Sequence, residues 1–180
     1  MTFIIRPARQ EEKPILEHLI ELSVRELSKH EYSQEQIDAA LQTVFGVDSE
    51  LVTDGTYFVI EDTEQSNALA ACGGWSKRKT LFGGDQFAAR ESELLDPAKD
   101  AAKIRAFFVH PAWARLGLGS LLLKHCEDAA KVHGFSRLEL MGTLPGVKLY
   151  REYGFAAGET ILHDAGNGVK IPFVPMWKQI

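Results

Sequence analysis

The sequence has few of the features that mark secreted, membrane-spanning or metal-binding proteins. It holds only two cysteines, Cys72 and Cys126, which are far apart and favour two buried, reduced thiols. Its six histidines and two cysteines show no HExxH or CxxC spacing, so we expect no metal site. No apolar run approaches the roughly 20 residues that span a membrane, and the N-terminus lacks a signal-peptide core. We therefore expect a cytoplasmic protein with no membrane partner.

An excess of positive charge is also missing. The chain has 20 Lys and Arg residues against 25 Asp and Glu residues. A protein that binds nucleic acid by broad phosphate neutralisation needs the opposite balance, so we expect no nucleic-acid partner. Internal repeats, low-complexity tracts and clear linkers are absent as well. A chain of 180 residues then predicts one domain over residues 1–180.

The hydrophobic patterns predict an α/β (α+β) fold with a mixed central sheet of about seven strands flanked by about four helices. The sheet is expected to be antiparallel at its start and parallel in the middle, where a strand, a helix and a strand follow one another. The predicted strands cover 2–6, 56–61, 68–75, 104–109, 137–141, 155–163 and 169–178. The predicted helices cover 11–30, 33–45, 118–133 and 144–153.

Several local signals refine this prediction. Ser33 and Gln36 form the pattern of a capping box at a helix start. The pair Gly73-Gly74 indicates a bulge or a close approach of another group to the backbone. Pro172 and Pro175 predict that the last strand lies at an edge or has bulged pairing. The irregular segment 77–102 is long for a loop in a small domain, which is typical of functional or mobile loops, and a short helix is expected near 88–95.

The stretch from Phe107 to Gly134 contains a glycine-rich turn between a predicted strand and a predicted helix. Backbone N–H groups at a helix start are unpaired and favour a phosphate. A dinucleotide fingerprint would use Gly117 and Gly119, with Glu139 as the ribose ligand, but Leu122 replaces its third glycine. A P-loop is excluded because no Gly-Lys-Ser/Thr follows. A turn with no ligand is the other interpretation.

A second signal follows about 30 residues later, where Tyr150 precedes Gly154-Phe155. Alone, Tyr150 is more often a core aromatic. Together with Val109-His110-Pro111 and Arg115-Leu116-Gly117-Leu118-Gly119, this pattern resembles the GCN5-related N-acetyltransferase (GNAT) superfamily. The resemblance covers nearly the whole chain, including the order of elements. It implies the GNAT acyl-CoA N-acyltransferase fold and acetyl-CoA as co-substrate.

The resemblance also implies roles for individual residues. A backbone N–H near Phe107 or Phe108 would polarise the thioester carbonyl, and Tyr150 would protonate the departing CoA thiolate. Two positions depart from the family pattern, because Ala114 stands where a cation is usual and Thr143 where Asn is common. The implied cofactor-binding residues are Phe107, Phe108, Val109, Arg115, Leu116, Gly117, Leu118, Gly119, Ser120, Thr143 and Tyr150.

The acceptor side is less defined by the sequence. A base must deprotonate the acceptor ammonium, and Glu139, His110 and Asp85 are the open candidates. The segment 81–85 is a candidate flap over the acceptor. The run 77–79 is either a solvated loop or a contact for a phosphate or an acidic acceptor. The other residues expected near the acceptor are His30, Glu31, Tyr32, Trp75, Phe82, Phe87 and Trp113.

The leading function is therefore transfer of acetyl from acetyl-CoA to a primary amine of a small molecule. The open alternatives are a protein or peptide amine as acceptor, a longer acyl group as donor, and a non-catalytic acyl-CoA-binding sensor. By analogy with other proteins of this fold, a homodimer that forms through an edge strand or the last hairpin is also expected.

Overall fold

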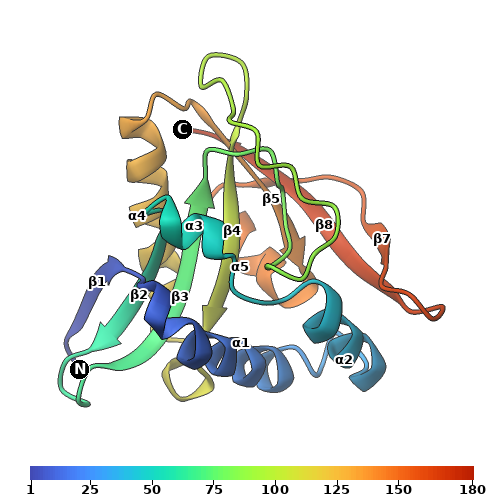
Figure 1. The fold of residues 1–180 in the computed structure, drawn as a ribbon, viewed down its shortest axis with the longest axis horizontal. Helices are drawn as coiled ribbons and strands as arrows, with labels where there is room; N and C mark the ends of the chain where they lie inside the picture. The colour runs from blue at the N-terminus through green and yellow to red at the C-terminus, as the bar shows by residue number, and fades with distance from the viewer.

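The computed structural model describes all 180 residues and has one mixed sheet with helices on both faces (Figure 1). The strand order is β1-β2-β3-β4-β5-β8-β6, with β7 also paired to β8. Only β4 and β5 are parallel, and the other pairs are antiparallel. The strands are β1 (Phe3–Pro7), β2 (Tyr57–Asp62), β3 (Ala68–Ser76), β4 (Ala102–Val109), β5 (Arg137–Thr143), β6 (Ala156–Ala157), β7 (Ile161–Asp164) and β8 (Lys170–Gln179).

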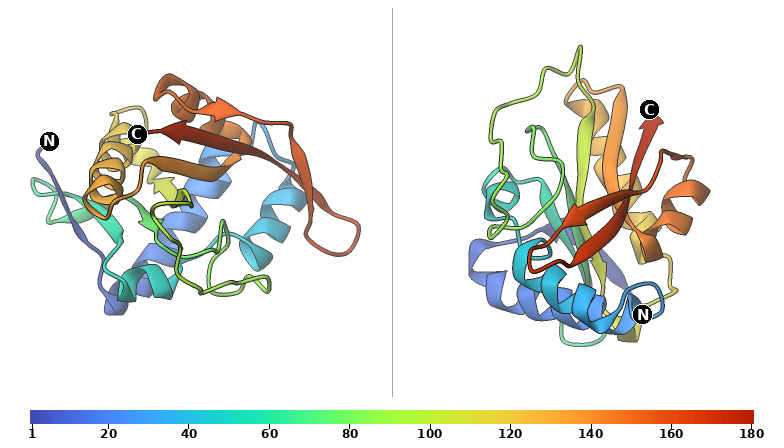
Figure 2. Two further views of the ribbon diagram at one scale, coloured as in Figure 1. Left: turned by 90° about the horizontal axis from the view of Figure 1, so that it is seen from above. Right: turned by 90° about the vertical axis from the view of Figure 1, so that its right-hand side faces the viewer.

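Two hydrophobic clusters lie on the two faces of this sheet (Figures 1 and 2). One cluster is covered by α4 (Leu118–Val132) and α5 (Val147–Glu152). The other is covered by α1 (Lys13–Leu27), α2 (Gln34–Thr43) and α3 (Ser49–Thr53). Short 3₁₀ turns occupy Gln10–Glu12, Pro111–Trp113 and Leu144–Gly146. The predicted α/β fold with a mixed sheet is confirmed.

The long helices form where apolar residues recur at helical spacing. In α1 the buried side chains include Leu16, Leu19 and Ile20, which follow the predicted stripe. At the start of α2, Gln36 N–H donates to Ser33 Oγ (3.1 Å) and Ser33 N–H donates to Gln36 Oε1 (2.9 Å), which is the predicted capping box. No helix is long and apolar enough to cross a lipid bilayer.

Two helix predictions differ from the structure. The five-residue α3 was not predicted, because so short a helix shows no periodicity; its start is capped by Asp48, whose Oδ1 accepts from Glu50 N–H at 3.0 Å. The helix expected near 88–95 is wrong. This part instead pairs with the earlier half of its own loop through an Arg78–Leu94 bridge and the bond from Lys79 N–H to Glu93 O (3.0 Å).

The C-terminal strands also differ from prediction. The strand expected over 155–163 is divided into β6 and β7, and β8 is not an edge strand because β5 flanks it on one side and β6 and β7 on the other. Each proline pairs with a strand on one side only, Pro175 with Met141 of β5 and Pro172 with Leu162 of β7. On the other side of each proline, the carbonyl accepts from a group outside the ladder. Pro175 O accepts from Gly158 N–H (2.8 Å), beyond the end of β6, and Pro172 O accepts from the Tyr32 hydroxyl (2.8 Å).

The glycine pair in β3 marks a bulge, as predicted. Cys72 pairs with Phe108 and Gly74 pairs with Arg105, so Ala106 and Phe107 both lie opposite the single residue Gly73. A Cβ on Gly73 would lie 2.5 Å from Phe107 Cδ1, and one on Gly74 would lie 2.3 Å from Thr56 O. Glycine is therefore required at both positions by close neighbours, one of which is the Phe107 ring.

Candidate active site

A cavity of about 810 Å³ lies where β4 and β5 part. The two strands pair only at Ala102–Leu138 and Lys103–Glu139. Beyond these pairs, side chains from both strands line the cavity, among them Phe107 on β4 and Leu140 on β5. A gap between parallel strands leaves main-chain groups without ladder partners, so a ligand can bind between them.

The bulge at Ala106 accompanies this separation. Ala106 has a φ of 52°, which is the left-handed region and is unfavourable for a residue with a Cβ. The Tyr57 hydroxyl donates to Ala106 O at 3.1 Å and helps to hold this conformation. Strained backbone of this kind is often found at functional sites. The bulge turns Phe107 toward the face that carries α4 and Phe108 toward the face that carries α1.

The turn before α4 presents a row of free backbone N–H groups. Ala114 N–H donates to Pro111 O (3.2 Å) and Leu121 N–H donates to Gly117 O (3.0 Å), but the six N–H groups of 115–120 have no acceptor in the protein. Arg115 and Gly117 have φ values of 66° and 79°, which turn the chain into the helix. Free N–H groups at a helix start, with its positive partial charge, form an anion site.

Tyr150 lies near the end of α5 with its ring in the core. Its residue is 8% exposed, and the ring centroid is 6.5 Å from that of Phe107 and 5.7 Å from that of Phe155. It lines the cavity, and burial raises the pKa of its phenol. No hydrogen bond within the protein uses the hydroxyl. A phenol with a raised pKa keeps its proton and can donate it to a ligand.

The structure brings nearly all of the predicted cofactor-binding residues to this one cavity. The exception is Leu116, whose side chain is exposed outside it. The residues that line the cavity are Phe107, Phe108, Val109, Arg115, Gly117, Leu118, Gly119, Ser120, Thr143 and Tyr150. Ala114 and Lys148 also line the cavity. Lys148 precedes Leu149, whose side chain lies beside Gly119 in the first turn of α4.

None of the three candidate bases lines the cavity. Glu139 forms an ion pair with Lys103 on the neighbouring strand. His110 Nδ1 accepts from Ala112 N–H (3.1 Å). Asp85 Oδ2 is 2.8 Å from Lys13 Nζ. Each of these groups already has a partner elsewhere in the fold, which is information that the sequence does not carry.

The predicted acceptor residues fall into two groups. His30, Glu31 and Phe82 line the cavity. Phe87 packs behind Phe82, with 4.8 Å between ring centroids, and does not line it. The sequence missed Phe45, Phe173 and Arg105, which also line the cavity, because no local pattern distinguishes a cavity-lining aromatic from a core aromatic.

The other three predicted acceptor residues are structural, and placing them at the acceptor was wrong. Tyr32 joins two elements, because its hydroxyl accepts from Leu144 N–H (2.9 Å) and donates to Pro172 O. Trp75 is 1% exposed and packs against His133 in the core, on the side of α4. Trp113 is buried, and its Nε1 donates to Asp62 Oδ2 at 3.0 Å.

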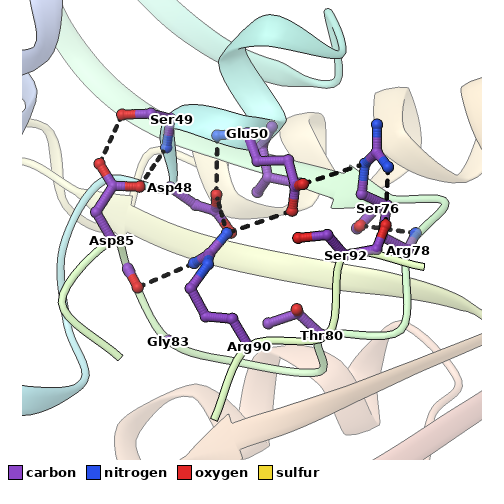
Figure 3. A network of polar contacts seen from close by, with 12 residues as sticks. Asp48, Ser49, Glu50, Ser76, Arg78, Thr80, Gly83, Asp85, Arg90 and Ser92 are labelled. Atoms are coloured by element: carbon purple, nitrogen blue, oxygen red, sulfur yellow. Dashed lines mark hydrogen bonds and ion pairs between the residues drawn. The ribbon is translucent and has the colours of Figure 1, made fainter. Parts of the chain in front are cut away.

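The segment 77–101, drawn in light green in Figure 1, is fixed to the rest of the fold by charged residues. Asp48 is at the centre, 1% exposed, and accepts from Arg90 Nη2 (2.8 Å) and Arg105 Nη2 (2.7 Å). Figure 3 shows Asp48 beside Arg90 and Glu50, and Asp85 bonded to Ser49. Burial lowers the pKa of Arg105. The carboxylate of Asp48 opposes this effect, because its charge and its hydrogen bond stabilise the charged guanidinium.

Residues 81–84 line the cavity and are anchored to the rest of the fold, which argues against the flap expected over 81–85. Gly84 N–H donates to Val44 O (2.7 Å), and Asp85 N–H donates to Val47 O (2.9 Å). Arg105 Nη2 also donates to Gly83 O at 2.6 Å. The basic run 77–79 is likewise not a free patch, since Arg78 Nε is 2.8 Å from Asp54 Oδ2 and Lys79 pairs with Glu93.

Replacing Asp48 with Asn should lower the free energy of unfolding by about 3–5 kcal/mol, because Arg105 is then buried without its counter-ion. Denaturant unfolding followed by circular dichroism measures this loss. Asp38→Asn is the matched control: Asp38 pairs with Arg25 at the surface, with its side chain 46% exposed, and should change stability by less than about 1 kcal/mol. Equal effects of the two substitutions would contradict a structural role for the buried network.

A family model described as the acetyltransferase (GNAT) family matches residues 16–155. No curated protein matches the sequence.

Similar solved structures have low sequence identity. A GCN5-related N-acetyltransferase from Rhodopseudomonas palustris has a TM-score of 0.72 and 17% identity, and the match covers 100% of this chain and 97% of that one. The PaiA N-acetyltransferase from Thermoplasma acidophilum in complex with coenzyme A has a TM-score of 0.67 and 15% identity over 100% of both chains. A mosquito arylalkylamine N-acetyltransferase-like protein has a TM-score of 0.65 and 16% identity over 99% of this chain and 100% of that one. At these identities the likeness establishes the fold.

Proposed function

The chain belongs to the acetyltransferase (GNAT) family, and we propose that it transfers the acetyl group of acetyl-CoA directly to the primary amine of a small molecule. The observation that carries this proposal is the row of six free N–H groups over 115–120, which opens onto the same cavity as Tyr150. The first feature suits a phosphate and the second suits proton donation to a leaving group.

The residues present fit acetyl-CoA. The free N–H groups would hold its pyrophosphate, with Arg115 from the same turn as a cation. Lys148 also lines the cavity and would add a second cation on leaving Glu152, its surface partner at 3.8 Å. The gap between β4 and β5 would take the pantetheine arm, with Thr143 along its path. When bound, acetyl-CoA supplies the acetyl group as a thioester.

The chain's own groups then have distinct tasks. The backbone N–H of Phe107, beside the bulge, would donate to the thioester carbonyl and stabilise the charge that develops on its oxygen. Phe108 pairs with Cys72 and, like His110, directs its N–H toward β3, so it is not proposed for this role. The Tyr150 hydroxyl holds a proton for the departing sulfur. Glu139, His110 and Asp85 lie outside the cavity, so none of them is proposed as the base.

The arrangement of the cavity walls favours a small acceptor molecule. One side is formed by 81–84, which is tied to Val44 and Arg105, and another by the C-terminal half of α1 with His30 and Glu31. A fixed wall restricts the room for an extended peptide. The mosquito protein's name refers to a small amine, which agrees with this choice of acceptor class.

The experiment is a two-part assay on the full chain. Calorimetry with acetyl-CoA should show binding, and a panel of small primary amines should give release of the CoA thiol with at least one of them. Binding without release from any amine or peptide would favour a non-catalytic sensor. Release with peptides alone would favour a protein acceptor.

A further inference from the structure

The part of the cavity on the face that carries α1 and α2, here called the acceptor chamber, is strongly aromatic. Tyr150 and Phe107 belong to the hydrophobic cluster on the face with α4, whereas the chamber's side chains belong to, or pack against, the cluster on the opposite face. The cavity therefore passes between β4 and β5 from one face to the other. The chamber is lined by Phe45, Phe82, Phe108, Met141 and Phe173.

The rings of the chamber are set at angles to one another. Phe45 lies edge to face with Phe108, at 5.8 Å between centroids, and with Phe173, at 6.1 Å. Phe82 is 5.8 Å from Phe173. Phe45, Phe82 and Phe108 are only half-buried, so part of each ring faces the cavity. Such rings present apolar faces and edges that suit a flat apolar ligand.

The chamber offers no free Lys or Arg side chain to a ligand carboxylate. Its only nearby guanidinium, Arg105, has its side chain 2% exposed and is engaged with Asp48, Thr80 O and Gly83 O. The network around it has no spare positive charge, because four cations (Lys13, Arg78, Arg90 and Arg105) meet five carboxylates (Glu17, Asp48, Glu50, Asp54 and Asp85). A carboxylate buried in this chamber would have no partner, which carries a large desolvation cost.

The mouth of the chamber carries negative charge. Glu26 and Glu31 line it from the end of α1 and the turn that follows, and both are exposed. Glu26 pairs with Lys29 (3.0 Å), whereas Glu31 has no ion-pair partner. Of the other charged residues in the lining, Arg115 belongs to the turn with the free N–H groups, and Lys148 pairs with Glu152 (3.8 Å). A cationic amine is attracted to the mouth, and an acidic acceptor is repelled.

We propose that the acceptor is a primary amine on a short alkyl arm of an aromatic ring, with no carboxylate beside the amine. This inference rests on the proposed acetyl transfer. The cationic amine first loses one proton to solvent, and its neutral nitrogen then bonds to the acetyl carbon as the carbon–sulfur bond breaks. The sulfur takes a proton from Tyr150, and the second proton lost by the nitrogen returns to Tyr150 through solvent. The products are the N-acetyl amine and free CoA.

The test compares 2-phenylethylamine with phenylalanine, which has the same ring and arm plus a carboxylate, and with spermidine as a non-aromatic cation. Release of CoA thiol should give a kcat/KM for 2-phenylethylamine at least about 100-fold above that for phenylalanine, and above that for spermidine. Equal or higher values for phenylalanine or spermidine would overturn the inference while leaving acetyl transfer in place. Loss of acetyl-CoA binding in calorimetry would instead count against the proposed function.

Two neighbouring phenylalanines supply the matched variants. Phe82→Leu should raise the KM for 2-phenylethylamine about tenfold and leave the Kd for acetyl-CoA unchanged, because Phe82 lines the chamber. Phe87→Leu, in the same segment but outside the lining, should change KM much less. Equal KM values for the two variants would overturn the assignment of the acceptor to this chamber. A thermal melt of each variant establishes that both are folded under the assay conditions.

Discussion

Gly117→Glu is expected to lose at least about 100-fold in affinity for acetyl-CoA. Gly117 is the residue before α4 and lies in the middle of the free N–H groups. A Cβ there meets nothing within 4 Å, so the new side chain has room and needs no rearrangement of the core. Its carboxylate would occupy the position proposed for the pyrophosphate and repel it. Isothermal titration with acetyl-CoA measures the loss.

The matched control is Gly117→Gln. It has the same size and suffers the same backbone strain at a φ of 79°, but carries no charge. We expect a smaller loss, of about tenfold. If the two variants bind acetyl-CoA equally well, charge at this position is not important and the pyrophosphate site lies elsewhere.

Tyr150→Phe is expected to lower kcat by about 100-fold with little change in the Kd for acetyl-CoA. The substitution removes one hydroxyl and keeps the ring that packs on Phe107 and Phe155. Burial raises the pKa of Tyr150. The protonated phenol is the active form. The fall in kcat at high pH should therefore begin above the pH range in which a free tyrosine loses its proton. Steady-state rates measured against pH give both quantities.

Tyr153→Phe is the control for this prediction. Tyr153 follows α5 one turn after Tyr150, but it does not line the cavity, and Lys178 Nζ lies 4.3 Å from its ring centroid. Its substitution should leave kcat within about twofold of the parent. A Tyr150→Phe enzyme with unchanged turnover would remove the hydroxyl from the proton-donating role.

The cofactor end of the cavity could be predicted from sequence because its signals are local. The glycines that open α4 and the residues from Tyr150 to Phe155 act through the conformation of a few consecutive residues. Free N–H groups at a helix start follow from chain geometry alone. The structure places these two stretches on one cavity, as the resemblance implied, although their roles in binding and catalysis stay predictions.

The acceptor end could not be predicted in the same way, because it depends on contacts between distant residues. Asp85 resembled a free carboxylate until its partners Lys13 and Ser49 were placed beside it. Trp75 is an aromatic residue of a kind often found in binding sites, but it lies in the core. Phe45 and Phe173 are separated by 128 positions (173 − 45), yet their rings are in contact. No periodic pattern in the sequence predicts a contact between residues so far apart.

The last strand illustrates a second reason. Proline predicts an edge because it lacks an N–H group, and that reasoning assumes a continuous ladder. In the structure Pro172 pairs with Leu162 of β7 on one side, while on the other side β5 has ended at Thr143 and the Pro172 carbonyl accepts from the Tyr32 hydroxyl. A side-chain partner from the loop between α1 and α2 therefore takes the place of a neighbouring strand.

The anchored wall at 81–84 has a consequence for how this protein can acquire new acceptors. Its position depends on main-chain bonds from Gly84 to Val44 and on the guanidinium of Arg105, while Phe82 adds packing against Phe87 and Phe173. The main-chain bonds do not require particular side chains at 81 and 82. With the acceptor bound in the proposed chamber, substitutions at these two positions would change the acceptor preference while the main-chain anchors of the wall remain.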